Sequence, residues 1–294
     1  MKELVFVHGR AQQFKNPTDL KSEWVDAFRR GLKKNGLDLP IPESNIRFPY
    51  YGQTLHDLVT GQSAEDVARV IVKGEDADQE KTEFLGAVFE EIRQRFDITD
   101  SQLREVGGHD VIERGFLNWE RVQTILKAID QYVPGASGAT VALFTNDVYE
   151  YLANPGLQSV IDSGVRSAID SSVETVVVSH SLGTVVAYSL LRREGQSLGW
   201  NVPLHVTLGS PLALQVIKRK LSPIGFPACV DRWFNAMDER DVVALYPLTA
   251  DSFPVAPPIE NKTDVRNHTK NRHGIAGYLD DEEVASQIYN ALVD

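Results

Sequence analysis

The sequence has 294 residues, of which 42% are hydrophobic and 24% are charged, which is enough for one large globular core. Its 41 Asp and Glu outnumber its 30 Lys and Arg, and the net charge of −11 disfavours nucleic acid and anionic membranes as partners. Cys229 is the single cysteine, so no internal disulfide forms, and no apolar run approaches the length that spans a bilayer. We therefore expect a cytoplasmic protein with no stable membrane insertion.

Short apolar runs alternate with longer stretches of helical periodicity along the chain. The first run, residues 4–7, ends in His8-Gly9 and is typical of a strand buried on both faces of a sheet. Similar patterns predict further strands at residues 45–51, 174–179, 203–208, 228–236 and 259–265. Helical patterns separate these strands, among them residues 24–32, 185–191 and 281–292. This alternation predicts an α/β fold with a mostly parallel central sheet and helices on both faces.

Residues 53 to about 135 interrupt the alternation with helical patterns alone. Amphipathic patterns cover residues 83–96 and 119–132, and Gly107-Gly108 marks a break between them. We expect the whole chain to form a single domain in which this insertion is a helical cap or lid. Packing as scaffold, or as the interface of a homodimer, is the alternative.

The strongest chemical signal is the turn that follows the predicted strand at residues 174–179. It has the pattern small-x-Ser-x-small, in which Ser181 lies between Ser179 and Gly183. A sharp strand-to-helix turn exposes the central hydroxyl above the sheet, and small flanking residues avoid clashes there. The N-terminus of the following helix favours a developing oxyanion. Ser181 is therefore the predicted nucleophile, with Ser179 in place of the more usual glycine.

A serine hydroxyl is a weak nucleophile at neutral pH and needs a base that is oriented by an acid. In sites built on this turn, the acid and then the base follow the serine in the chain. Asp241 is the predicted acid because two valines after it can anchor its loop, whereas Asp238 is flanked by charge. His273 is the predicted base because the glycine after it permits a close approach, whereas His268 lies in a polar run. Asp238 and His268 are the alternatives.

Two backbone amides are expected to bind the oxyanion. One is the amide of Leu182, directly after the nucleophile, and the other is that of Arg10, where Gly9 permits the turn after the first strand. His180 is expected to point into the fold. No spacing of histidines predicts a metal site, and no partner can be named for the remaining His56, His109 and His205.

Together these residues resemble the α/β-hydrolase superfamily, in its lipase- and esterase-like branch. His8-Gly9 is similar to the end of the family's oxyanion strand, and residues 179–183 are similar to its nucleophile turn. Residues 208–212 resemble the stretch after the next strand, and the predicted acid and base occupy the family's positions.

The resemblance implies a sheet without the family's two leading strands. It also implies hydrolysis of a small-molecule or lipid ester through an acyl-enzyme on Ser181, with no cofactor. Lipid deacylase, thioesterase or acyltransferase activity under a mobile cap are alternatives, and so is a noncatalytic binding protein with the same fold. The fold alone does not determine the substrate.

Overall fold

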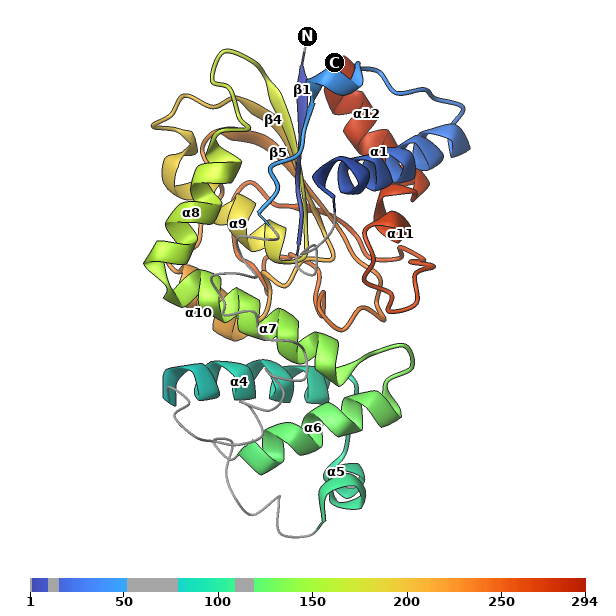
Figure 1. Cartoon of the computed structure of the whole chain (residues 1–294), viewed down its shortest axis with the longest axis vertical. Helices are drawn as coiled ribbons and strands as arrows, with labels where there is room; N and C mark the ends of the chain where they lie inside the picture. Colours follow the sequence, from blue (N-terminus) through green and yellow to red (C-terminus); the bar gives the residue numbers. More distant parts are fainter. Residues whose placement is uncertain (1, 10–15, 52–78, 109–118) are drawn as a thin grey trace.

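The computed structural model describes residues 2–9, 16–51, 79–108 and 119–294, and this part of the chain forms an α/β protein (Figure 1). Its central sheet has six strands, all parallel, in the order β2-β1-β3-β4-β5-β6. The strands are β1 (Glu3–Val7), β2 (Ile46–Arg47), β3 (Thr175–His180), β4 (Val202–Leu208), β5 (Val230–Ala236) and β6 (Glu260–Lys262). The predicted α/β class, with a parallel sheet flanked by helices, is confirmed.

Each face of the sheet has its own apolar core, and side chains alternate between the two. On β1, Leu4 and Phe6 join one core, whereas Val5 and Val7 join the other. Figure 1 shows helices on both faces. The first face is covered by α1 (Pro17–Lys34), α11 (Ala276–Leu279) and α12 (Glu282–Val293), and the second by α8 (Pro155–Arg166), α9 (Leu182–Leu190) and α10 (Gln215–Leu221). Burial of both faces explains why the strands have near-continuous apolar sequences.

Helix α1 begins before the apolar pattern at residues 24–32 because its start is capped. The side chain of Asn16 accepts hydrogen bonds from the amides of Thr18, at 2.8 Å, and Asp19, at 3.4 Å. Pro17 occupies the first turn, where a missing amide hydrogen costs nothing. The helix then buries Trp24 against the sheet.

The strand predicted at residues 45–51 is shorter in the structure, where only Ile46 and Arg47 pair with β1. Beyond them, aromatic side chains gather around the ring of His8 instead of continuing the ladder. The ring of Tyr51 lies 4.0 Å from that of His8, and the Tyr51 amide donates to His8 Nε2 at 3.1 Å. The ring of His8 therefore accepts the hydrogen bond that the Tyr51 amide would otherwise donate to a neighbouring strand.

The described chain between β2 and β3 is helical. A layer of helices lies beyond the carboxyl ends of the strands, and α8 returns along the sheet (Figure 1). This helical layer consists of α4 (Gln79–Arg95), α5 (Asp100–Gly107), α6 (Trp119–Tyr132) and α7 (Gly138–Ala153). Gly108, at a φ of 86°, ends α5 at the predicted break. Residues 52–78 and 109–118 of the expected insertion lie outside the described residues.

The helical layer and the second face of the sheet share one apolar core. Phe84 and Phe89 of α4, Ile129 of α6 and Phe144 of α7 belong to the same buried cluster as Val7 of β1. Within the described ranges, apolar contacts of α7 with α9 and of α4 with α10 join the helical layer to the helices on this face of the sheet.

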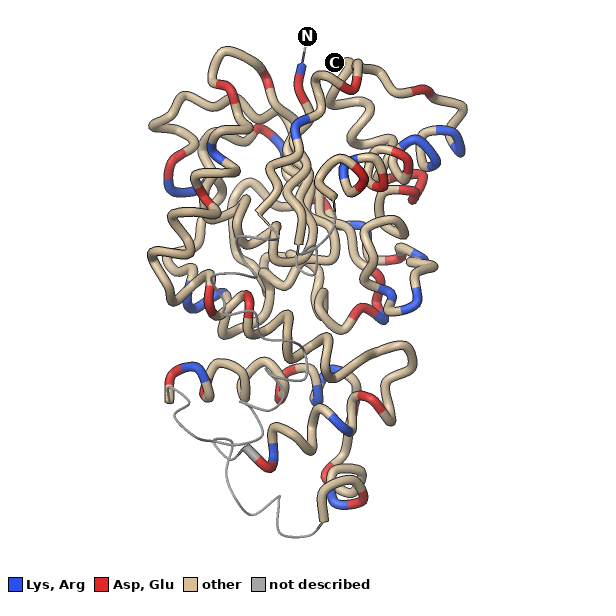
Figure 2. The backbone as a smooth tube through the Cα atoms, in the orientation of Figure 1, with Lys and Arg blue, Asp and Glu red and all other residues tan. Residues whose placement is uncertain are grey.

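Charged side chains lie mostly around the outside of the molecule, whereas the strands at its centre carry few (Figure 2). Basic and acidic residues are interspersed on this surface. Within the described ranges, no helix is both long enough and apolar enough to cross a bilayer.

Candidate active site

Ser181 occupies a tight turn between the end of β3 and the start of α9. Its backbone has a φ of 56° and a ψ of −129°, a conformation that non-glycine residues rarely adopt. Hydrogen bonds hold it there: the Ser181 amide donates to Leu208 O at 3.1 Å, and the Ser181 carbonyl accepts from the Thr184 hydroxyl at 2.8 Å. The turn predicted from the sequence is present at this position.

Two glycines allow the backbone to pack closely around this turn. A Cβ atom on Gly183 would lie 2.6 Å from the carbonyl oxygen of His8, and closer still to that of Val7. A Cβ atom on Gly9 would lie 2.7 Å from Cβ of Ser181. The end of β1 and the start of α9 therefore approach each other more closely than any side chain would allow.

Ser179, which stands where glycine is more usual in such a turn, is fully buried and satisfied. Its hydroxyl donates to the carbonyl of Val206 at 3.0 Å and lies 3.1 Å from Nε2 of His205. His205, for which the sequence indicated no partner, thus bonds to the turn from β4. Burial lowers the pKa of His205 to about 3, so its ring is neutral.

The structure brings Ser181, His273 and Asp241 together. Nε2 of His273 lies 2.8 Å from Oγ of Ser181, and Nδ1 of His273 lies 2.7 Å from Oδ2 of Asp241. Because a carboxylate only accepts, Nδ1 carries the proton, which leaves Nε2 to accept from the serine hydroxyl. Asp241 is buried, and its Oδ1 accepts from the Val243 amide at 2.8 Å. The three side chains form one continuous series of hydrogen bonds.

The two alternatives to the acid and the base lie in other contacts. Asp238 is paired with the guanidinium of Arg240 and accepts from the amide of Asn267 at 2.9 Å. His268 bonds through Nε2 to Asp280, at 2.8 Å, directly after α11. Within the described residues, neither side chain is hydrogen-bonded to Ser181, and both bond within or next to the loops that carry Asp241 and His273.

Two residues that the sequence did not suggest complete the surroundings of His273. Tyr278 of α11 donates to Oδ2 of Asp241 at 2.6 Å. His180 lies with its ring 4.7 Å from that of His273 and its Nε2 2.7 Å from the His273 carbonyl oxygen. The sequence placed His180 next to Ser181 and pointing into the fold, and it is buried, but its contact with His273 was not predicted.

One of the two expected oxyanion amides can be placed. Leu182 is the first residue of α9, and the first amides of a helix have no partners within it. Arg10 lies outside the described residues, as do His56 and His109. Gly9, next to Arg10, is described and lies against Ser181 as stated above.

His8 shapes the end of β1 beside this turn. Its Nδ1 donates to the Gly9 carbonyl at 2.6 Å, and its Nε2 accepts from the Tyr51 amide. Burial lowers the pKa of His8 to about 4, so the ring is uncharged at neutral pH. Within the described ranges, no group of three or more His, Cys, Asp and Glu could hold a metal ion.

The strand order places Ser181 where α/β sheets generally bind ligands. The chain leaves β1 toward β2 on one side and reaches β3 on the other, so the order reverses between β1 and β3. Ligands of open α/β sheets bind outside the carboxyl ends of the strands at such a reversal. Phe144 of the helical layer faces this edge, with its ring 6.5 Å from that of His273 and edge-on to it.

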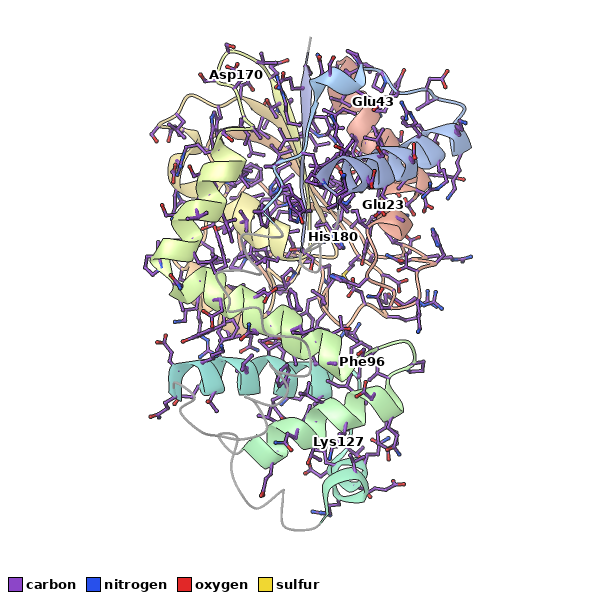
Figure 3. All side chains as sticks on the ribbon, viewed as in Figure 1. Glu23, Glu43, Phe96, Lys127, Asp170 and His180 are labelled. Carbon is purple, nitrogen blue, oxygen red and sulfur yellow. The ribbon has the colours of Figure 1, made fainter. Side chains whose placement is uncertain are left out.

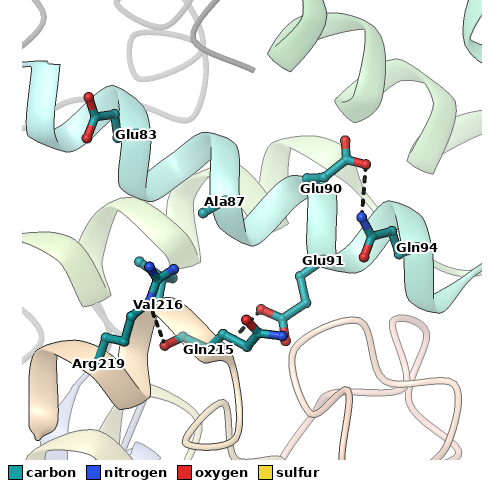
Figure 4. Close-up of a pocket in the computed structure, with 8 residues that line it drawn as sticks. All are labelled: Glu83, Ala87, Glu90, Glu91, Gln94, Gln215, Val216 and Arg219. Carbon is teal, nitrogen blue, oxygen red and sulfur yellow. Dashed lines mark hydrogen bonds between the residues drawn. The ribbon is translucent and has the colours of Figure 1, made fainter. Parts of the chain in front are cut away.

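A separate groove of about 280 Å³ lies between α4 and α10 (Figure 4). Its lining is polar on the α4 side, and Glu91 there accepts a hydrogen bond from the Gln215 amide at 3.1 Å. Burial raises the pKa of Glu91 above its usual value. The groove contains none of the three residues of the hydrogen-bonded series, so we assign it to the contact between the helical layer and α10.

The chain has no significant match among protein-family models, among curated proteins or among solved structures. Its function must therefore be inferred from the geometry of the site.

Proposed function

We propose that the chain is a serine hydrolase of the α/β-hydrolase type that cleaves carboxylic esters through an acyl-enzyme on Ser181. The proposal depends above all on the series from Ser181 Oγ through His273 to Asp241, with distances of 2.8 and 2.7 Å. A hydroxyl, an imidazole and a buried carboxylate in this order are the groups that activate a serine for attack on a carbonyl.

In the first half of the proposed reaction, Nε2 of His273 removes the hydroxyl proton while Oγ of Ser181 attacks the ester carbonyl carbon. The imidazolium that forms is stabilised by Asp241, whose buried carboxylate also fixes the ring orientation. The negative oxygen of the tetrahedral intermediate is bound by the amide of Leu182, at the positive end of α9. Collapse breaks the bond to the alcohol, which leaves with the proton from His273.

In the second half, water attacks the acyl group on Ser181. His273 accepts a proton from this water and then returns it to Oγ, so that the acid product leaves and the free hydroxyl is restored. The reaction uses side chains, main-chain amides and water only. A second amide, from Arg10, is expected to complete the oxyanion site.

Three further features support this proposal. The nucleophile, acid and base follow one another along the chain in the order Ser181, Asp241, His273, which is the order of α/β-hydrolases. The nucleophile occupies a strained strand-to-helix turn with close glycine contacts. Phe144 and the helical layer lie next to the base, which favours a substrate with an apolar group, such as a lipid or small aromatic ester.

Labelling with a fluorophosphonate probe tests the proposal, because such probes react with activated serines. The wild-type chain should be labelled on the peptide that contains Ser181 and should hydrolyse at least one member of a series of p-nitrophenyl esters of graded acyl length. Ser181→Ala should lose both activities. Ser197→Ala, a change at an exposed serine, should keep both.

Two outcomes would contradict the proposal. The first is a wild-type chain that is folded but neither labelled nor active on any ester of the series, which would indicate a binding protein. The second is Ser181→Ala that retains wild-type turnover. Activity that rises sharply on micelles would place the enzyme among lipid deacylases rather than esterases for soluble substrates.

A further inference from the structure

His180 makes a direct contact with the main chain of the predicted base. Its Nε2 lies 2.7 Å from the carbonyl oxygen of His273, and the two rings are 4.7 Å apart. A carbonyl oxygen only accepts hydrogen bonds, so Nε2 of His180 carries the proton and donates it. Figure 3 shows His180 on the side of the sheet that faces α11, at the end where the strands meet the loops.

This contact joins two parts of the site that are distant in sequence. His180 is the last residue of β3 and is bonded covalently to Ser181, so its ring position is set by the nucleophile turn. The main chain next to His273 bonds largely within its own loop, for example from the His273 amide to Asn271 Oδ1 at 3.2 Å. The side chain of Asn267 likewise donates to the Gly274 carbonyl at 2.9 Å. The bond from His180 therefore ties this loop to the sheet.

We propose that His180 is a positioning residue, whose hydrogen bond to the His273 carbonyl keeps the imidazole of His273 within reach of the Ser181 hydroxyl. The inference rests on the proposed function. Asp241 holds the His273 ring from its Nδ1 side, and His180 holds the main chain of the same residue from the nucleophile side. With both ends held, Nε2 of His273 keeps its 2.8 Å distance to Oγ.

The surroundings of His180 keep its imidazole ring neutral, with the proton on Nε2 available for donation. Trp24 of α1 and Tyr278 of α11 lie with their ring centres 6.1 and 6.0 Å from that of His180. The titratable groups that act on it are His273, Asp241 and His8. Burial, and next to it the proximity of His273, lower the pKa of His180 to about 3. His180 therefore stays neutral while His273 gains and loses a proton.

Substitution of His180 by glutamine or by asparagine separates the effect of its hydrogen bond to the His273 carbonyl from the effect of its packing. In His180→Gln the side-chain amide reaches about as far as Nε2 of histidine, so it can donate to the His273 carbonyl. In His180→Asn the same amide group is one methylene shorter and cannot reach. His180→Leu keeps the apolar packing and has no donor. We would measure kcat and KM on a soluble p-nitrophenyl ester, the rate of fluorophosphonate labelling and the melting temperature of each variant.

We expect His180→Asn and His180→Leu to lower kcat and the labelling rate by about 10- to 100-fold, because small displacements of a catalytic group have effects of this size. KM should change little, since His180 is not expected to contact the substrate. His180→Gln should stay within a few-fold of the wild type. Equal activity in all variants, or losses in His180→Gln as large as in His180→Asn, would overturn the inference.

A measurement on the wild type covers the case in which the shorter variants do not fold. Nitrogen-15 spectra of the imidazoles should show His180, identified by the signals missing in His180→Gln, as the neutral tautomer with its proton on Nε2, down to pH 5. A proton on Nδ1 of His180, or a charged ring, would contradict the hydrogen bond from Nε2 to the His273 carbonyl.

A wild-type chain that is not labelled by fluorophosphonate would overturn the proposed function. A labelled wild type with unaffected His180 variants would overturn this inference alone.

Discussion

Tyr278 and His273 donate to the same oxygen atom, Oδ2 of Asp241, at 2.6 and 2.7 Å. Tyr278 is fully buried, and burial together with the charge of Asp241 raises the pKa of its hydroxyl well above the usual value, so it always donates. Its hydroxyl also accepts from the Asp238 amide at 3.2 Å. Tyr278 thus holds the Asp241 carboxylate in place, and the same carboxylate oxygen accepts from both Tyr278 and His273.

Tyr278→Phe removes one of the two donors to Oδ2 while keeping the ring. The carboxylate of Asp241 is then held less firmly against the ring of His273, so kcat/KM should fall by about 10-fold. The free energy of unfolding should fall by about 1.5–3 kcal/mol, the range for a hydrogen bond to a charged group. Hydrolysis of a soluble p-nitrophenyl ester and urea denaturation measure the two effects.

Tyr151→Phe is the matched control for this change. Tyr151 is also buried and donates to a buried carboxylate, that of Asp162, at 2.8 Å, but it lies between α7 and α8. It should lose a similar amount of stability with no change in kcat/KM. A kcat/KM of Tyr278→Phe equal to that of the wild type would mean that Tyr278 acts on stability alone.

Asp241 and Asp238 are both buried carboxylates on one loop, yet they should respond very differently to substitution by asparagine. Asp241→Asn removes the charge beside His273 and allows the wrong ring tautomer, so kcat should fall by about 10⁴-fold. Asp238→Asn weakens the contacts with Arg240 and Asn267 and should mainly reduce stability. Turnover of one ester by both variants compares them, and a loss in Asp238→Asn as deep as in Asp241→Asn would reverse the assignment.

Substitution by alanine should have opposite effects at Gly183 and at Gly164. A Cβ atom on Gly183 would meet the backbone of β1, 2.6 Å from the His8 carbonyl oxygen, whereas one on Gly164 of α8 has no neighbour within 4 Å. Gly183→Ala should cost about 1–3 kcal/mol of stability and abolish labelling of Ser181. Gly164→Ala should stabilise α8 by about 0.5–1 kcal/mol. Thermal unfolding provides both values, and a stable, active Gly183→Ala would contradict the close packing of the turn.

Stability should fall as the pH is lowered below 6.5, because three buried histidines resist protonation in the folded chain. Burial lowers the pKa from 6.5 to about 4 for His8, and to about 3 for His180 and His205. The unfolded chain takes up these protons near pH 6.5 and the folded chain does not, so each group contributes a slope of about 1.4 kcal/mol per pH unit, down to its own folded pKa.

His205→Gln tests this prediction, because His205 bonds to Ser179 and has no hydrogen bond to Ser181 or His273. Its amide can still bond to the Ser179 hydroxyl, but it does not titrate. Urea denaturation at pH 7.5, 6.0 and 5.0 should show a slope smaller by up to about 1.4 kcal/mol per pH unit than in the wild type. The same slope in both proteins would indicate that His205 is protonated in the folded state.

The parts of the structure that follow from local patterns could be predicted from the sequence. The buried strands, α4 and α6, and the strand-to-helix turn at Ser181 each result from residues close together in the chain. At two places the structure differs from the sequence prediction because of tertiary contacts. The strand predicted at residues 45–51 is cut short because Tyr51 bonds to His8, and α7 was missed because it is buried on nearly all sides and lacks a clear polar face.

The same distinction applies to the candidate site. Asp241 and His273 could be proposed because chain order and neighbouring apolar residues or glycine narrow the choice. The roles of Tyr278 and His180 depend on how the loops around residues 238–241 and 267–275 fold against each other. No short pattern encodes such contacts, and only the spatial structure reveals that both residues bond to members of the series.

The apolar core that the helical layer shares with the sheet constrains how a substrate enters. Through this core, α7 packs against α9 and α4 packs against α10, and exposing one buried apolar side chain at such a contact would cost about 1.5–3 kcal/mol. Swinging the helices away as one body would break both contacts, so the burial of these side chains opposes such a motion. We therefore expect the helical layer to stay packed against α9 and α10 while an ester reaches Ser181.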